Sequence, residues 1–159
     1  MTGITVLQGG GAFSLHDQLD ARLLQEVNAK RVVVLPTADA FEEPEILVAA
    51  AKSWAQRLGI EVEALMVMRR TDAMEQSAAD VVRKAQAVWF VGDNPIHLRS
   101  VMKGTPVWTS ACPEPSRSIS TRTLLSFVFR STRPVRLMLC LHPCWPPRRQ
   151  REPSCRPWP

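Results

Sequence analysis

Arg31-Val32-Val33-Val34-Leu35 is apolar and mostly β-branched after its first residue, and it ends at Pro36-Thr37-Ala38. A strand that is apolar at every position, rather than at alternate ones, is typical of a parallel sheet covered by helices on both faces. A second run of this kind, Ala87-Val88-Trp89-Phe90-Val91, stops at Gly92-Asp93-Asn94. The two runs predict the buried centre of an α/β domain.

Strand and helix patterns alternate around these two runs. Further strands are expected at Gly3–Gln8 and Ile60–Val67 because both are short and rich in β-branched or apolar residues. Apolar residues at helical spacing predict helices at Asp17–Asn28, Pro44–Leu58 and Asp72–Lys84, and a short helix after Asn94. This order predicts a three-layer, mostly parallel, flavodoxin-like sheet with an irregular C-terminal tail.

Ligands of such sheets bind beyond the carboxyl ends of the strands. The predicted topology therefore gathers four loops into one crevice: Gly9–Phe13, Pro36–Phe41, Met68–Asp72 and Gly92–Asn94. Within these loops, substrate contacts are predicted for Gly10, Gly11, Thr37 and Asn94.

Two glycine-containing turns in this crevice have competing interpretations. Gly9-Gly10-Gly11 lets backbone N–H groups approach an anion, but a tight strand-to-helix turn explains it better, and Ser14 stands where a dinucleotide fingerprint needs its third glycine. Gly92 and Asp93 follow a buried strand, where a backbone N–H can serve as an oxyanion hole. Ordinary turn and N-cap chemistry also fits Gly92-Asp93-Asn94.

Charged and titratable residues near the crevice are also ambiguous. Asp39, Glu42 and Glu43 form either an acidic rim or a solvated helix start. His16 and His97 lie at helix starts without an identifiable Ser or Cys partner, and a surface or capping role is the better interpretation for both. No metal site and no cofactor is predicted.

The composition changes after Trp108. The chain has 159 residues, and residues 1–108 carry 11 Lys and Arg against 13 Asp and Glu, whereas residues 109–159 carry 9 Arg against 2 Glu. All 7 Gly lie at or before Gly104, and all 4 Cys lie after Trp108. We therefore expect an α/β domain over residues 1–108 and a disordered or non-native tail over residues 109–159. Because the excess of positive charge lies in the tail, the net charge of +5 does not indicate nucleic-acid binding by the whole chain.

The tail matches no recognisable binding module. Cys140, His142, Cys144 and Cys155 lack the usual zinc-ligand spacing. Arg148-Arg149-Gln150-Arg151 with its neighbouring tryptophans resembles a basic aromatic RNA-binding tail, but its proline content fits poorly. No nucleic-acid or membrane partner is predicted, and the oligomeric state stays open. The sequence shows no signal-peptide pattern and no apolar stretch long enough to span a membrane, so the cytoplasm is the expected location.

Three motifs in order, Leu7-Gln8-Gly9-Gly10-Gly11-Ala12, Val33-Val34-Leu35-Pro36-Thr37-Ala38 and Val88-Trp89-Phe90-Val91-Gly92-Asp93-Asn94, resemble the dipeptidase E and cyanophycinase-like serine peptidases. The similarity covers residues 3–108 and implies the class I glutamine amidotransferase-like fold. It also implies hydrolysis of small peptides or acidic peptide polymers by a serine in a GxSAG elbow, with a later histidine and an oxyanion hole that includes Gly92 and Asp93.

The sequence departs from that family at the nucleophile. No GxSAG or GxSxG occurs, since no glycine follows Gly104. The chain is therefore predicted to be inactive as a peptidase. Out-of-frame reading of a GC-rich gene explains the tail composition: one codon choice for Thr132-Arg133-Pro134-Val135-Arg136 reads Ser-Ala-Gly-Ala in a shifted frame. A genuine lineage-specific tail is the rival explanation.

Two alternative functions remain open. A non-catalytic binding module would use the glycine-lined crevice or the Arg-rich tail. A glutamine amidotransferase-like domain would need a cysteine nucleophile, but Cys112 in Ser-Ala-Cys-Pro-Glu-Pro has no glycine elbow.

If the tail is non-native, the shortened sheet is expected to expose an edge beside Ala87–Val91, with low solubility and marginal stability.

Overall fold

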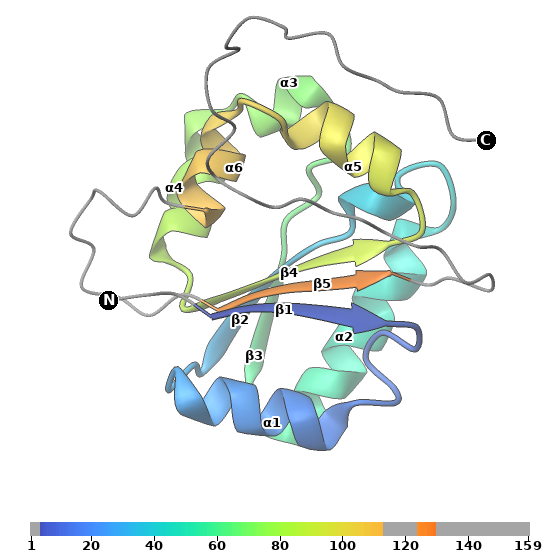
Figure 1. The fold of residues 1–159 in the computed structure, drawn as a ribbon, viewed down its shortest axis with the longest axis vertical. Helices are drawn as coiled ribbons and strands as arrows, with labels where there is room; N and C mark the ends of the chain where they lie inside the picture. The colour runs from blue at the N-terminus through green and yellow to red at the C-terminus, as the bar shows by residue number, and fades with distance from the viewer. Residues whose placement is uncertain (1–3, 113–123, 130–159) are drawn as a thin grey trace, which may run out of the picture.

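The computed structural model describes residues 4–112 and 124–129, and these form an α/β unit (Figure 1). Strands and helices alternate along the chain as the apolar patterns predict. The elements are β1 (Ile4–Gly9), α1 (Asp17–Glu26), β2 (Arg31–Leu35), the 3-10 turn η1 (Thr37–Asp39), α2 (Pro44–Leu58), β3 (Glu61–Ala64), α3 (Arg70–Ala73), α4 (Gln76–Lys84), β4 (Ala87–Gly92), α5 (Pro95–Met102), α6 (Pro106–Ala111) and β5 (Leu124–Phe129).

The five strands form one parallel sheet in the order β1-β5-β4-β2-β3. Because all five strands run the same way, their carboxyl ends meet at one edge of the sheet, where η1 and the start of α5 also lie (Figure 1). The predicted three-layer parallel architecture is confirmed.

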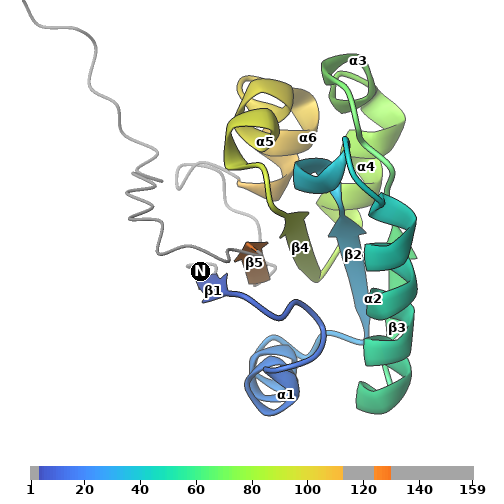
Figure 2. The same ribbon diagram turned by 90° about the vertical axis from the view of Figure 1, so that its right-hand side faces the viewer.

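Alternate residues of the central strands enter different cores. Val32 and Val34 of β2 pack with α1 and α2, whereas Val33 and Leu35 pack with α4, α5 and α6. Every residue of β4 is buried, as expected for a strand with helices over both faces. Figure 2 shows α1 and α2 separated from the group α4, α5 and α6 by the sheet.

Three features differ from the predicted elements. The helix expected at Asp72–Lys84 is divided into α3 and α4, with Met74 ending the first helix and Glu75 in an extended conformation before the second. Helix α6 begins after the Thr105 cap and runs through the compositional boundary at Trp108 to Ala111, which is fully buried.

The third difference is β5 (Leu124–Phe129), a strand that lies within the predicted tail of residues 109–159. It pairs with β1 on one side and with β4 on the other, and Gly92 is in register with Phe129. The expectation of an exposed sheet edge beside Ala87–Val91 is therefore wrong, since β4 is flanked by β2 and β5 and the described edges are β1 and β3.

A buried polar network ties β1 to the two helices beneath it. Both oxygens of the Asp20 carboxylate accept hydrogen bonds, from Gln8 Nε2 at 2.6 Å and from Trp54 Nε1 at 3.1 Å. Asp20 is 2% exposed, and burial raises its pKa. Arg57 of α2 binds Asp17 and donates to the Phe13 carbonyl at 2.6 Å, so it holds the loop after β1 against α2.

No helix in the described part of the chain is long and apolar enough to cross a membrane.

Candidate functional site

Gly92 ends β4 in a conformation that only glycine adopts without strain. Its φ is +130°, and a Cβ atom there would lie 2.4 Å from both the Ala38 carbonyl carbon and the Asp39 nitrogen. Asn94 N donates to the Ala38 carbonyl at 2.8 Å. The turn after β4 is therefore packed directly on the backbone of η1, so two of the predicted crevice loops meet (Figure 1).

The side chains of Asn94 and Thr37 do not lie free in this crevice. Asn94 is the N-cap of α5, and its Oδ1 accepts the hydrogen bond of His97 N at 2.9 Å. Thr37 in η1 is fully buried, and its hydroxyl meets no hydrogen-bond partner within the described residues. The alternative capping interpretation of Asn94 accounts for its geometry, and a direct substrate contact by Thr37 would need the turn to move.

Gly10 and Gly11 lie in a separate tight turn after β1. Both have a positive φ, and the Gly11 carbonyl accepts from Ser14 N at 3.0 Å and Leu15 N at 3.2 Å. Strand β5 separates β1 from β4, so this turn is one strand removed from Gly92. The structure thus matches the tight-turn interpretation of the triple glycine.

Acidic residues gather where η1 meets the turn after β4. Oxygen atoms of Asp39, Glu42 and Asp93 lie within 4.8 Å of one another, with Asp39 buried and the other two exposed. The expected acidic rim therefore includes Asp93 in place of Glu43. Such clusters occur on many protein surfaces without an ion, and no other feature of the described residues here indicates a metal.

A groove of about 690 Å³ adjoins this acidic cluster and shares Glu42 with it. It is formed by the start of α2, the segment after β3 and one side of α5. Its lining residues are Ala40, Phe41, Glu42, Pro44, Glu45, Met66, Met68, Arg69, Arg70, His97, Ser100 and Val101. The volume lies in the range of small-molecule sites. None of residues 9–13 lines it, so the four predicted loops do not form one continuous site.

Several contacts hold the groove together. His97 Nε2 lies 3.0 Å from the Met68 carbonyl, and the His97 ring meets Phe41 edge-on at a centroid distance of 4.5 Å. The Asp72 carboxylate accepts from Arg69 N at 2.9 Å and Met68 N at 3.0 Å, and these backbone bonds lower its pKa. The surface or capping role predicted for His97 therefore does not describe these contacts, since its ring packs on Phe41 and lies beside the Met68 carbonyl. The Nε2 atom of His16 is buried and has no hydrogen-bond partner among the described residues.

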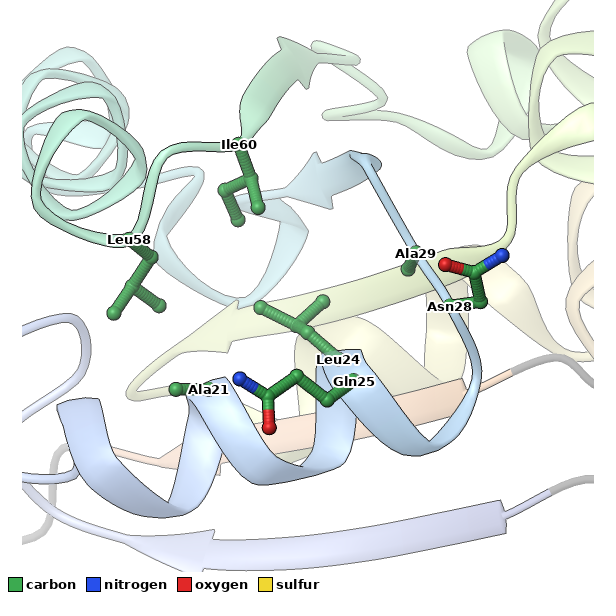
Figure 3. Close-up of a pocket in the computed structure, with 7 residues that line it drawn as sticks. All are labelled: Ala21, Leu24, Gln25, Asn28, Ala29, Leu58 and Ile60. Carbon is green, nitrogen blue, oxygen red and sulfur yellow. The ribbon is translucent and has the colours of Figure 1, made fainter.

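A smaller cavity of about 140 Å³ lies at the opposite edge of the sheet (Figure 3). Ala29 and Ile60 in its wall precede β2 and β3, so it opens at the amino ends of these strands. Ligands of parallel sheets bind at the other edge, and we assign no function to this cavity.

Among the described residues, neither Cys112 nor Ser110 has the surroundings of an activated nucleophile. Cys112 follows α6 in a largely apolar environment, and burial raises the pKa of its thiol to about 12, so it stays protonated and unreactive at neutral pH. Ser110 Oγ accepts a long hydrogen bond from Arg83 at 3.4 Å and lies near no histidine-based relay in this part of the chain. Outside the described residues lie Cys140, Cys144, Cys155, His142 and the segment Thr132–Arg136.

Sequence comparison gave no relative: no family model matches this chain, and no curated protein matches it. The fold does resemble solved structures. One of them is the crystal structure of a peptidase from an acI-B1 Actinobacterium, with a TM-score of 0.71 and 24% sequence identity over 80% of this chain. This chain covers 54% of that protein, so it spans about half the length of its structural neighbour. The chain thus has the fold found in the matching portion of a peptidase.

Proposed function

We propose that this chain binds small peptides at the carboxyl edge of its sheet and belongs to the serine-peptidase lineage of dipeptidase E and cyanophycinase, but does not cleave its ligands. The observation that supports the proposal is the Gly92 turn: its φ of +130° and its close contact with the η1 backbone fix the turn that the family resemblance assigns to the oxyanion hole. A peptidase with the same fold supports the lineage.

The missing step is nucleophilic attack. A serine on a strained strand-to-helix turn needs flanking glycines, and none follows Gly104. Asp93, where the family more often has a second glycine, also alters the turn. We expect the groove and turn to hold a peptide without forming an acyl-enzyme. The cytoplasmic location remains part of this proposal.

Three measurements test the proposal. Equilibrium binding and hydrolysis are measured with fluorogenic small peptides and acidic peptide polymers, and covalent labelling is measured with a fluorophosphonate probe. We expect peptide binding without hydrolysis and without covalent labelling. Hydrolysis blocked by the fluorophosphonate would contradict the predicted inactivity. Failure of every peptide to bind would overturn the proposed function itself.

The coding DNA provides a second test. We expect a shifted frame past codon 100 to encode GxSAG and a later histidine. An intact frame without these motifs would make residues 109–159 a genuine tail and would favour the non-catalytic binding module over a damaged peptidase.

A further inference from the structure

We propose that the groove between α2, the segment after β3 and α5 is a zwitterion site, which takes a short peptide with free termini and an apolar side chain. The inference deepens the proposed function and rests on it for the choice of a peptide ligand. Its own basis is the separation of charges in the groove described above.

Carboxylates and guanidinium groups line the same groove without neutralising one another. Glu42 lies just before α2 and Glu45 in its first turn, while Arg69 and Arg70 lie at the start of α3. The salt bridges of the described residues join Arg31, Arg57 and Arg83 to acidic partners but include none of these four side chains. Both signs of charge are therefore available to a ligand.

The arginines are held where they cannot collapse onto the acids. Arg70 Nη1 donates to the Lys103 carbonyl at 2.7 Å, which fixes it to the end of α5. The Asp72 carboxylate accepts a hydrogen bond from Arg69 N at 2.9 Å, which fixes the backbone of Arg69 at the rim of the groove, and the Arg69 charge also contributes to lowering the pKa of Asp72. A ligand with a carboxylate at one end and an ammonium at the other would complete both halves of the groove.

The rest of the groove lining is largely apolar and adaptable. Phe41 is 77% exposed and Met66 is 43% exposed, and Met68 and Val101 lie beside them in the groove. Exposed aromatic and methionine side chains accommodate apolar groups of varied shape. An apolar side chain on the peptide would bury this surface.

Binding of the tripeptide Ala-Leu-Ala to the full chain, measured by isothermal titration calorimetry, tests the inference against its N-acetylated and C-amidated forms. We expect each cap to weaken binding about fivefold, the magnitude of a partly exposed charge interaction. In Arg69→Gln, C-terminal amidation should no longer weaken binding, whereas N-terminal acetylation should still weaken it. In Glu45→Gln, N-terminal acetylation should no longer weaken binding, whereas C-terminal amidation should still weaken it. Arg22→Gln and Glu61→Gln remove exposed charges outside the groove and should retain both effects.

Equal binding of free and capped tripeptides would overturn the zwitterion site while leaving peptide binding intact. Unchanged cap effects in both Arg69→Gln and Glu45→Gln would overturn its placement in this groove. Hydrolysis of the tripeptide with the expected cap pattern would instead contradict only the predicted inactivity. Absence of binding by any form would overturn the proposed function and this inference together.

Discussion

Gly92 couples β4 to η1 through direct backbone contact, and no larger residue fits there. We expect Gly92→Ala to lower the free energy of unfolding by about 3 kcal/mol, since it adds both backbone strain and a steric clash. Gly59→Ala is the matched comparison, because Gly59 also has a positive φ but has open space around its α-carbon. That variant should lose about 1 kcal/mol in urea denaturation. Equal losses would contradict the close approach.

Asp20 is the buried acid whose environment gives a pH dependence. Burial raises its pKa above the ordinary 3.8, so the folded protein holds this proton more tightly than the unfolded chain. The stability that comes from this raised pKa is fully present below pH 3.8 and is lost as the pH rises through the folded pKa, whereas the hydrogen bonds from Gln8 and Trp54 remain. In Asp20→Asn this decline in the free energy of unfolding should be absent. Urea denaturation at a series of pH values, from below pH 3.8 to neutral pH, measures it.

Asp20→Ala should behave differently from the asparagine variant. It leaves the buried donors Gln8 Nε2 and Trp54 Nε1 without their acceptor, which should cost about 2 kcal/mol at neutral pH. Asp17→Ala on the same helix removes an ion pair at the surface and should cost well under about 1 kcal/mol. A loss in Asp20→Ala no larger than in Asp17→Ala would rule out the network as a stabilising tie.

At the scale of elements, the caps of α5 and α2 provide a direct comparison. Asn94 caps α5 through its side chain, so Asn94→Ala should lower the free energy of unfolding by about 1 kcal/mol. Glu43 precedes α2 without a side-chain cap, so Glu43→Ala should change it little. Chemical denaturation measures both. A large loss of tripeptide affinity in Asn94→Ala without a loss of stability would instead support the substrate contact that the sequence predicts.

Strand β5 can be tested by removing its backbone hydrogen bond. Ser126 is in register with Val6 on one side and Trp89 on the other. Ser126→Pro should cost about 3 kcal/mol or more because proline has no N–H to donate in an interior strand. Ser126→Ala keeps that bond and should unfold nearly as the unmodified chain does. Similar melting curves for the two variants would exclude β5 from the interior of the sheet.

The elements that the sequence predicted well are those whose side chains meet the cores on both faces. The uninterrupted apolar runs of β2 and β4 admit few other structures. The end of helix α6 and all of β5 lie after the change of composition at Trp108. Thr109-Ser110 favours no helix there, and Leu124–Phe129 is a strand whose pairing with β1 and β4 joins segments distant in sequence. The separate helix α3 begins where the Asp72 carboxylate accepts hydrogen bonds from Met68 N and Arg69 N, a contact that the helical spacing of apolar residues does not show.

The site was less predictable than the fold. The glycine that ends β4 indicated the turn, and the acidic residues before α2 indicated an acidic rim. Arg69 and Arg70 lie in the Met68–Asp72 loop that the topology assigns to the crevice, but their residue types gave no signal of a binding role, because exposed arginines are common on protein surfaces. Pairing of strands distant in sequence also placed Gly10 and Gly11 away from Gly92, which local patterns cannot show.

The whole molecule presents an apolar residue at a sheet edge. Strand β1 pairs with β5 alone in the described part of the chain, and Leu7 on it is 59% exposed. Exposed edge strands promote association, so we expect the sedimentation coefficient to rise with concentration. Leu7→Lys should suppress this rise, whereas Leu15→Lys in the following loop should not. A monomer at every concentration with a cooperative, high-temperature melt would contradict the expected association and marginal stability.

The place of β5 in the sheet also determines how the protein is made on the ribosome. The strand that joins β1 to β4 is the last described one to be synthesised, so β1 emerges early and waits until nearly all the described chain has followed. At typical rates of translation this wait is on the order of ten seconds. During it, both edges of the nascent β1 are open to chaperones and to other nascent chains. Slower translation of the segment before β5 would therefore reduce the yield of folded protein without changing its final stability.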